Sequence, residues 1–168
     1  MIPQGVGGMA EYDSRPDTLE HIRQVRLYLS VVITKLKQRR TDHDASKLQS
    51  PEVEGFDEFT PQLRLLTYGS PEYEAARTGL GVALEHHYAH NSHHPEHYER
   101  GICGMSLLDL VEMVCDWKAA TMRHADGDIR KSVEINQERF NYTNELKHII
   151  VNTLRELGLW EEETCKKT

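Results

Sequence analysis

The sequence predicts an all-α protein built as a helical bundle. Apolar residues recur at helical spacing, helix caps and terminators flank these stretches, and no segment shows a convincing strand-like alternation. With 168 residues, of which 38% are hydrophobic and 28% charged, the composition is that of one globular domain. We therefore expect a helical domain over residues 14–160, a flexible lead-in over 1–13 and a charged tail over 161–168.

In the first half of the chain, two long helices are predicted. The first begins near Asp17 and runs to about Arg39, and its apolar residues are Leu19, Ile22, Val25, Leu29, Val32, Ile33 and Leu36. The second begins at Ser70-Pro71, a cap followed by a proline at the first helical position, and should continue through Gly79 and Gly81 to about residue 90. Between them, Pro51 and Gly55 are expected to break up a short acidic segment.

The second half is predicted to be a loop followed by three helices. Residues 91–105 contain Asn, Ser, Pro and Gly and are expected to form the loop. Ser106 should cap an apolar helix that reaches about residue 125, and further helices are expected over 129–140 and 143–157. Gly158 then follows as a terminator.

The overall charge and the cysteines exclude several classes of protein. A net charge of −7 disfavours binding to duplex nucleic acid, which normally needs a basic face. No apolar run approaches the 20 or so residues that span a bilayer, and the N-terminus does not have the layout of a secretion signal. The three cysteines form no C-x-x-C pair, as is usual in a reducing compartment. We expect a cytoplasmic protein that does not bind a membrane.

The adjacent pair His43-Asp44 is the first candidate for metal binding. Imidazole nitrogen and carboxylate oxygen together suit a divalent ion such as Mn, Fe, Co, Ni, Zn or Mg. Lys47 follows one helical turn later, where its ammonium group would meet an anionic substrate beside the metal. The alternative for Lys47 is a solvated helix lysine.

A cluster of histidines comes later in the chain. Six of the ten histidines lie between residues 86 and 97, namely His86, His87, His90, His93, His94 and His97. Such a density is unusual for packing alone, because each imidazole needs polar partners. We interpret the cluster as part of a metal site, and the alternative is a surface loop with adventitious metal affinity.

Asp109, Glu112 and Asp116 are spaced by three and four residues and share one face of a predicted apolar helix. Like charges in this arrangement repel one another unless a cation compensates them. Asp109 also stands three residues after Ser106, where it would complete a capping box, and Glu112 would otherwise pair with a basic residue. On the following helices, the spacing of Asn136, Arg139, Asn141 and Asn144 does not single out a residue that contacts the substrate.

The order of these residues resembles that in HD-domain metal-dependent phosphohydrolases. In that superfamily a His, a His-Asp pair, further His and a final Asp surround one metal site on a helical bundle, and here HDASKL and VCDWKAAT match two of the segments. The resemblance implies the metal ligands His21, His43, Asp44, His86 and Asp116, and catalytic roles for Lys47, Glu112, Asp109 and His87. No His lies between Leu48 and Glu85, the region from which two-metal members take a further ligand, so the set His21, His43, Asp44 and Asp116 would hold one ion.

The chain also resembles a small uncharacterised family of phages and bacteria (DUF5662-like) over most of residues 14–160. The shared motifs are HD-x-S-K, H-x-x-H-N-x-H-H-P-E-H-Y and D-x-x-E-M-x-x-D-W. For a phage-encoded member, the cytoplasm would be that of the bacterial host.

The function expected from the HD resemblance is hydrolysis of a nucleotide or related phosphoester by a metal-activated water. The expected partner is this small molecule, and a homo-oligomer is compatible with the sequence. Three alternatives stay open: a di-iron oxygenase of the HD type, a non-catalytic protein that sequesters a nucleotide in phage counter-defence, and a helical domain stabilised by zinc.

Overall fold

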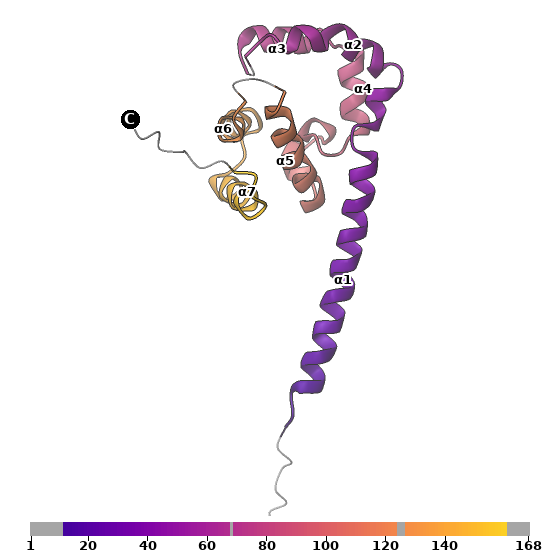
Figure 1. Ribbon diagram of the computed structural model, residues 1–168, viewed down its shortest axis with the longest axis vertical. Coiled ribbons are helices and arrows are strands. Elements are labelled where there is room, and N and C mark those ends of the chain that lie inside the picture. The colour runs from indigo at the N-terminus through magenta and orange to yellow at the C-terminus, as the bar shows by residue number, and fades with distance from the viewer. Residues whose placement is uncertain (1–11, 68, 124–126, 161–168) are drawn as a thin grey trace, which may run out of the picture. The chain divides into compact units, whose positions relative to one another are not determined.

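The computed structural model describes residues 12–67, 69–123 and 127–160, and within these ranges it is helical without strands (Figure 1). The predicted all-α class is therefore confirmed. The expected tail, and residues 1–11 of the expected lead-in, lie outside the described residues. The α-helices are α1 (Arg15–Asp42), α2 (Glu52–Leu63), α3 (Pro71–Thr78), α4 (Val82–His90), α5 (Leu107–Thr121), α6 (Ile129–Phe140) and α7 (Asn144–Glu156), and short 3₁₀ turns are η1 (Ala45–Leu48), η2 (Pro95–His97) and η3 (Gly101–Gly104).

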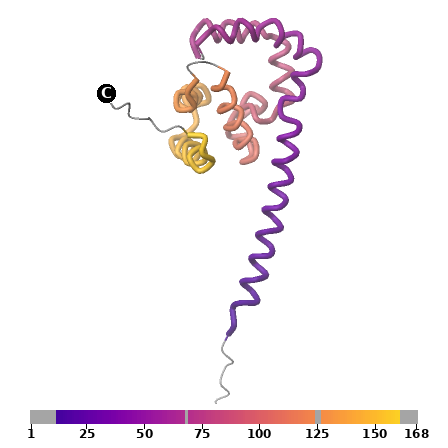
Figure 2. The backbone as a smooth tube through the Cα atoms, in the orientation of Figure 1, coloured from indigo at the N-terminus to yellow at the C-terminus, as the bar shows by residue number. Residues whose placement is uncertain are grey.

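The chain divides into two units, Met1–Thr41 and Asp42–Thr168. The first contains nearly all of α1, which Figure 2 shows as one uninterrupted helix. No residue of α1 is buried, and its predicted apolar stripe includes Leu19 and Leu29, which are more than half exposed (65% and 54%). No described helix is long and apolar enough to cross a bilayer.

The main core of the second unit lies between α5, α6 and α7 (Figure 1). Its buried members are Met113, Val114, Trp117, Ile129, Val133, Tyr142, Ile150 and Leu154. The Tyr142 hydroxyl donates a hydrogen bond to the carbonyl of Val133 (2.7 Å), so this buried phenol has a polar partner. Burial of this apolar set fixes the orientation of α5, the helix that carries Glu112 and Asp116.

The segment expected to be broken by Pro51 and Gly55 is instead the regular helix α2, so this prediction was wrong. Pro51 stands just before the first helical residue, where it removes no helical hydrogen bond. Gly55 lies where α2 packs on α4: a Cβ added there would lie 2.5 Å from the Cβ of Ala83. The glycine therefore permits close helix packing, and this contact outweighs its low helix propensity.

The single helix expected from residue 70 to residue 90 is divided into α3 and α4. Gly81 has φ +48° and ψ −120°, a conformation essentially restricted to glycine, and it turns the chain between the two helices. Two predicted caps are confirmed, because Ser70 and Ser106 each accept a backbone N–H at the start of a helix. Thr143, expected as the first residue of the last helix, is instead its cap. Gly158 follows α7 with φ +67°, as expected for a terminator.

Candidate metal centre

Asp44 stands at the centre of the candidate site, in the turn between α1 and η1. Its backbone is left-handed (φ 55°), a conformation that Asp tolerates better than most residues because its short side chain can bond locally. Burial opposes ionisation of Asp44, but the Lys47 ammonium 2.6 Å from Oδ2 and the imidazoles of His43 and His87 together outweigh it, and the pKa of this carboxyl is lowered. Asp44 is therefore a carboxylate at neutral pH.

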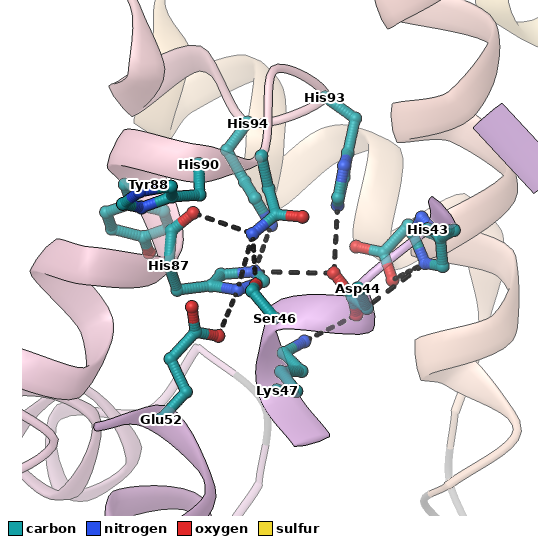
Figure 3. Close-up of polar contacts among 12 residues, drawn as sticks. His43, Asp44, Ser46, Lys47, Glu52, His87, Tyr88, His90, His93 and His94 are labelled. Atoms are coloured by element: carbon teal, nitrogen blue, oxygen red, sulfur yellow. Dashed lines mark hydrogen bonds and ion pairs between the residues drawn. The ribbon is translucent and has the colours of Figure 1, made fainter. Parts of the chain in front are cut away.

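Three imidazoles of the histidine-rich segment converge on Asp44 (Figure 3). Oδ1 of Asp44 lies 3.4 Å from Nε2 of His87 and 3.5 Å from Nε2 of His93, and Nε2 of His94 lies 2.8 Å from Nε2 of His87. Donor atoms bound to one ion at about 2.1 Å are roughly 3.0–3.4 Å apart for octahedral or tetrahedral angles. The four donor atoms therefore have the spacing of a metal ligand set.

Two atoms of this group are buried without a hydrogen-bond partner, Oδ1 of Asp44 and Nε2 of His93. They face each other at 3.5 Å, too far for a hydrogen bond of ordinary strength. An unsatisfied buried carboxylate oxygen or imidazole nitrogen costs about 1–3 kcal/mol or more. A divalent cation between them would satisfy both, so the residues fit a metal.

Glu52 fixes the orientation of the adjacent imidazoles. It is fully buried, and its two oxygens lie 2.7 Å from Nδ1 of His86 and 2.8 Å from Nδ1 of His87. A carboxylate accepts, so Nδ1 of His87 carries the proton and its Nε2 lone pair faces the group around Asp44. This is the arrangement by which an outer carboxylate orients a metal-binding histidine. Burial, followed by the nearby imidazoles of His93 and His87, lowers the pKa of His94 to about 2, which keeps this ring neutral.

A second group of donors lies on the other side of Asp44. Nε2 of His43 lies 3.6 Å from Oδ2 of Asp44 and 3.8 Å from Oδ1 of Asp116, and these three form another possible ligand set. Oε1 of Glu112 lies 2.9 Å from Nδ1 of His43 and 3.3 Å from Nδ1 of His93, so it holds both rings. Without a metal, Asp116 and then Glu112 raise the pKa of His43 to about 10, against the opposing effect of burial.

Asp109 holds the histidine-rich loop rather than facing the donor groups. It forms the capping box of α5 with Ser106, and it also accepts hydrogen bonds from the hydroxyls of Ser92 (2.8 Å) and Tyr98 (2.9 Å). Burial opposes ionisation, but these bonds, those from Ser106 first, lower the pKa of the Asp109 carboxyl. Because Ser92 immediately precedes His93, Asp109 positions two of the converging imidazoles.

The structure brings together most of the residues expected at the site. The residues that contribute donors to the groups are His43, Asp44, His87, Glu112 and Asp116. Glu112 also holds two imidazoles, and Lys47 pairs with Asp44. His21 is exposed on α1 in the first unit, and His86 lies against Glu52 and stacks on His90; neither belongs to a possible ligand group among the described residues.

Sequence reasoning did not assign roles to His93, His94 or Glu52. The two histidines were visible only as members of a dense cluster, and nothing in the sequence distinguished them from His86. Burial sets His93 apart, at 1% exposed, whereas His94 is half-buried like His86 and differs from it in lying 2.8 Å from Nε2 of His87. Glu52 had no signal beyond its place in an acidic segment.

A cavity of about 270 Å³ opens beside the donor groups. Lys47, His87, His94 and Asp116 all contribute to its lining, so a bound molecule would have direct access to the candidate ligands. Its size is near the lower end for small-molecule sites.

The fold and the site define an all-helical protein with clustered imidazole and carboxylate donors that could hold a metal ion. The chain belongs to a family of unknown function (DUF5662), whose model matches residues 10–165. No curated protein and no solved structure matches the chain. The HD-domain superfamily is not among these matches, and the resemblance to it stays a prediction.

Proposed function

We propose that this protein is a metal-dependent hydrolase of small phosphoesters, with nucleotides as the expected substrates. One observation carries the proposal: the buried Asp44 oxygen and His93 nitrogen face each other without hydrogen bonds, and two further imidazoles lie beside them. Imidazole and carboxylate donors suit first-row divalent ions such as Mn, Fe, Co, Ni and Zn.

Separate donor groups share Asp44, so these residues could hold two ions as well as one. Oδ1 of Asp44 is directed toward His87 and His93, and Oδ2 lies nearer to His43. Each oxygen thus lies on the side of a different group of possible ligands. Two ions held there would stabilise the attacking and leaving oxygens of a hydrolysis reaction. This set differs from the single-ion set expected from the sequence, which included His21.

In the proposed reaction, a bound divalent ion would lower the pKa of a water molecule and polarise the phosphoryl oxygens. The Lys47 ammonium lines the cavity and pairs with Asp44, where it would attract the phosphate and offset the charge that develops on it. Asp116 also lines the cavity, and its carboxylate would accept a proton from the attacking water if it is not bound to an ion.

The proposal is tested by supplying the purified protein with Mn, Co, Ni, Fe, Zn or Mg and a panel of mono-, tri- and cyclic nucleotides. We expect hydrolysis with at least one ion, and we expect D44A and H93A to lose both bound metal and activity while keeping the helical circular dichroism spectrum. H148A is the matched control, because His148 is exposed on α7 and belongs to no donor group. Full activity in folded D44A would contradict the proposal.

Oxygen activation at two irons is the second candidate, favoured by the four imidazoles, those of His43, His87, His93 and His94, in the donor groups. Metal analysis and oxygen consumption separate it from hydrolysis. Two irons with oxygen uptake and no phosphate release would support the oxygenase.

A further inference from the structure

The cavity beside the metal centre has a wall of polar residues that the metal centre does not use. This wall is one face of α6, where Ser132, Asn136 and Arg139 contribute to the lining. Ser132 and Asn136 are buried (5% and 0% exposed). The sequence did not show which of Asn136, Arg139, Asn141 and Asn144 contacts a substrate. In the structure Asn136 and Arg139 line the cavity, and Asn141 and Asn144 do not.

Cationic side chains outnumber carboxylates in the lining of the cavity, although the chain as a whole is negative. Six cationic side chains line it, Lys47, Arg64, Arg77, Arg123, Lys131 and Arg139, against three carboxylates, Glu96, Asp116 and Asp128. The net charge of the whole chain is −7. A concentration of one sign of charge in a partly enclosed space attracts ligands of the opposite sign. The lining therefore fits an anionic molecule.

Two of these cations converge on one phenol. Nη1 of Arg77, on α3, donates to the hydroxyl of Tyr88 (3.0 Å), and Nη2 of Arg139, on α6, lies 3.4 Å from the same oxygen. A carboxylate holds each guanidinium in place, Glu74 for Arg77 and Glu96 for Arg139. Planar guanidinium groups match the geometry of phosphate oxygens.

This pair of arginines lies close to the donor groups. The Tyr88 ring is 5.1 Å from the ring of His94, measured between centroids. The lining also has an apolar and aromatic part, with Leu80, Leu84, Trp117 and Phe140. A ligand with a phosphate at the metal centre could therefore place an apolar or aromatic part against this surface and a second charged group at Arg77 and Arg139.

We propose that the cavity binds the part of the substrate that is not hydrolysed, and that this part carries a second phosphate held by Arg77 and Arg139. The substrate class is then a nucleotide-sized bisphosphate, which carries its two phosphates at separate positions and an apolar or aromatic group beside them. That the molecule is a substrate rests on the proposed function. The anion site itself can be tested by binding alone.

The test compares two probes, adenosine 3′,5′-bisphosphate and adenosine 5′-monophosphate, titrated calorimetrically into the metal-loaded full-length protein. The bisphosphate should bind more tightly to the unmodified protein. In R77Q and R139Q this preference should fall on the order of 10-fold to 100-fold, the usual effect of losing a hydrogen bond to a charged group. R100Q is the control, because Arg100 is exposed and does not line the cavity.

Metal content and thermal melting are measured on each variant, so that an effect on folding is recognised. If one variant does not fold, the other decides the result. An unchanged preference for the bisphosphate in a folded, metal-loaded variant would overturn the assignment, and so would equal affinity of the unmodified protein for both probes. Release of phosphate from p-nitrophenyl phosphate, which has a single phosphate, tests the proposed function separately: its absence would count against hydrolysis, while the titrations would still decide on the anion site.

Discussion

Glu52 determines which nitrogen of His87 is available to a metal, because its buried carboxylate accepts a hydrogen bond from Nδ1–H. In E52Q a neutral amide would replace this acceptor and would hold the ring less firmly. We expect metal affinity to fall about 10-fold to 100-fold, the usual effect of losing an outer carboxylate. Metal titration measures the change. E54Q is the control, since Glu54 is exposed on the same helix, and equal affinities of the two variants would argue against this role for Glu52.

His43 should make the stability of the metal-free protein depend on pH. Its pKa in the folded protein is about 10, raised chiefly by Asp116 and Glu112, against about 6.5 in the unfolded chain. A raised pKa means that the folded state binds the proton more tightly, so this stabilisation is complete below pH 6.5 and is lost as the pH rises through about 10.

Urea denaturation in the presence of a chelator, between pH 6 and pH 10, measures this contribution. The free energy of unfolding of H43N should fall less over this range than that of the unmodified protein, since other groups titrate equally in both. Parallel pH profiles for the two proteins would show that the His43 proton does not stabilise the fold.

At the scale of elements, the contact between α2 and α4 depends on a residue without a side chain. In G55A the new Cβ would lie 2.5 Å from that of Ala83, so the two helices must separate, and Glu52 on α2 would move away from His87 on α4. We expect a loss of about 1–3 kcal/mol in the free energy of unfolding, typical of an overpacked contact.

The double variant G55A/A83G supplies the control for this contact. Removing the Ala83 methyl restores the space, so the double variant should be more stable than G55A, even though glycine at residue 83 lowers helix propensity. Denaturant unfolding of the three variants gives the coupling between the two sites. Additive losses in the double variant would mean that the predicted clash does not occur.

Asp109 connects α5 to the loop that carries His93 and His94. D109A would remove the acceptor for Ser92, Tyr98 and Ser106 together, so it should lower both the melting temperature and the metal affinity. S106A removes the side chain that caps α5 but leaves the bonds from Ser92 and Tyr98, and should lower mainly the melting temperature. If both variants bind metal equally well, the loop does not depend on Asp109.

At the scale of the whole molecule, metal binding should stabilise the fold, because the donors come together only in the folded state. An ion present at 100 times its dissociation constant adds about 2.7 kcal/mol, which corresponds to a rise in melting temperature of about 5–11 °C for a domain of this size. Chelation should reverse the rise in the unmodified protein and leave the melting temperature of D44A unchanged. Equal shifts in both proteins would place the stabilising ion elsewhere.

The sequence by itself determined the features that depend on neighbouring residues. The all-α class, the caps at Ser70 and Ser106 and the terminator Gly158 follow from interactions within a few residues, and the structure has each of them. The helices around Gly55 and Gly81 were predicted wrongly, because packing on Ala83 and a glycine-only backbone conformation override local propensity. The sequence also identified His43-Asp44 and the acidic face of α5 as candidates, since closely spaced charges are visible without a fold.

Only the tertiary structure decided which histidines meet these carboxylates. His86 and His87 are neighbours in the chain, yet His86 contacts only Glu52 of the two carboxylates, whereas His87 also faces Asp44. His93 and His94 reach Asp44 because Asp109 holds the loop that carries them. They are too far from Asp44 in the sequence for helical spacing to predict this contact. The physical reason is that burial and donor geometry arise from contacts between helices and loops. The sequence shows which residues could bind a metal, but it does not show which of their side chains point toward the same place in the fold.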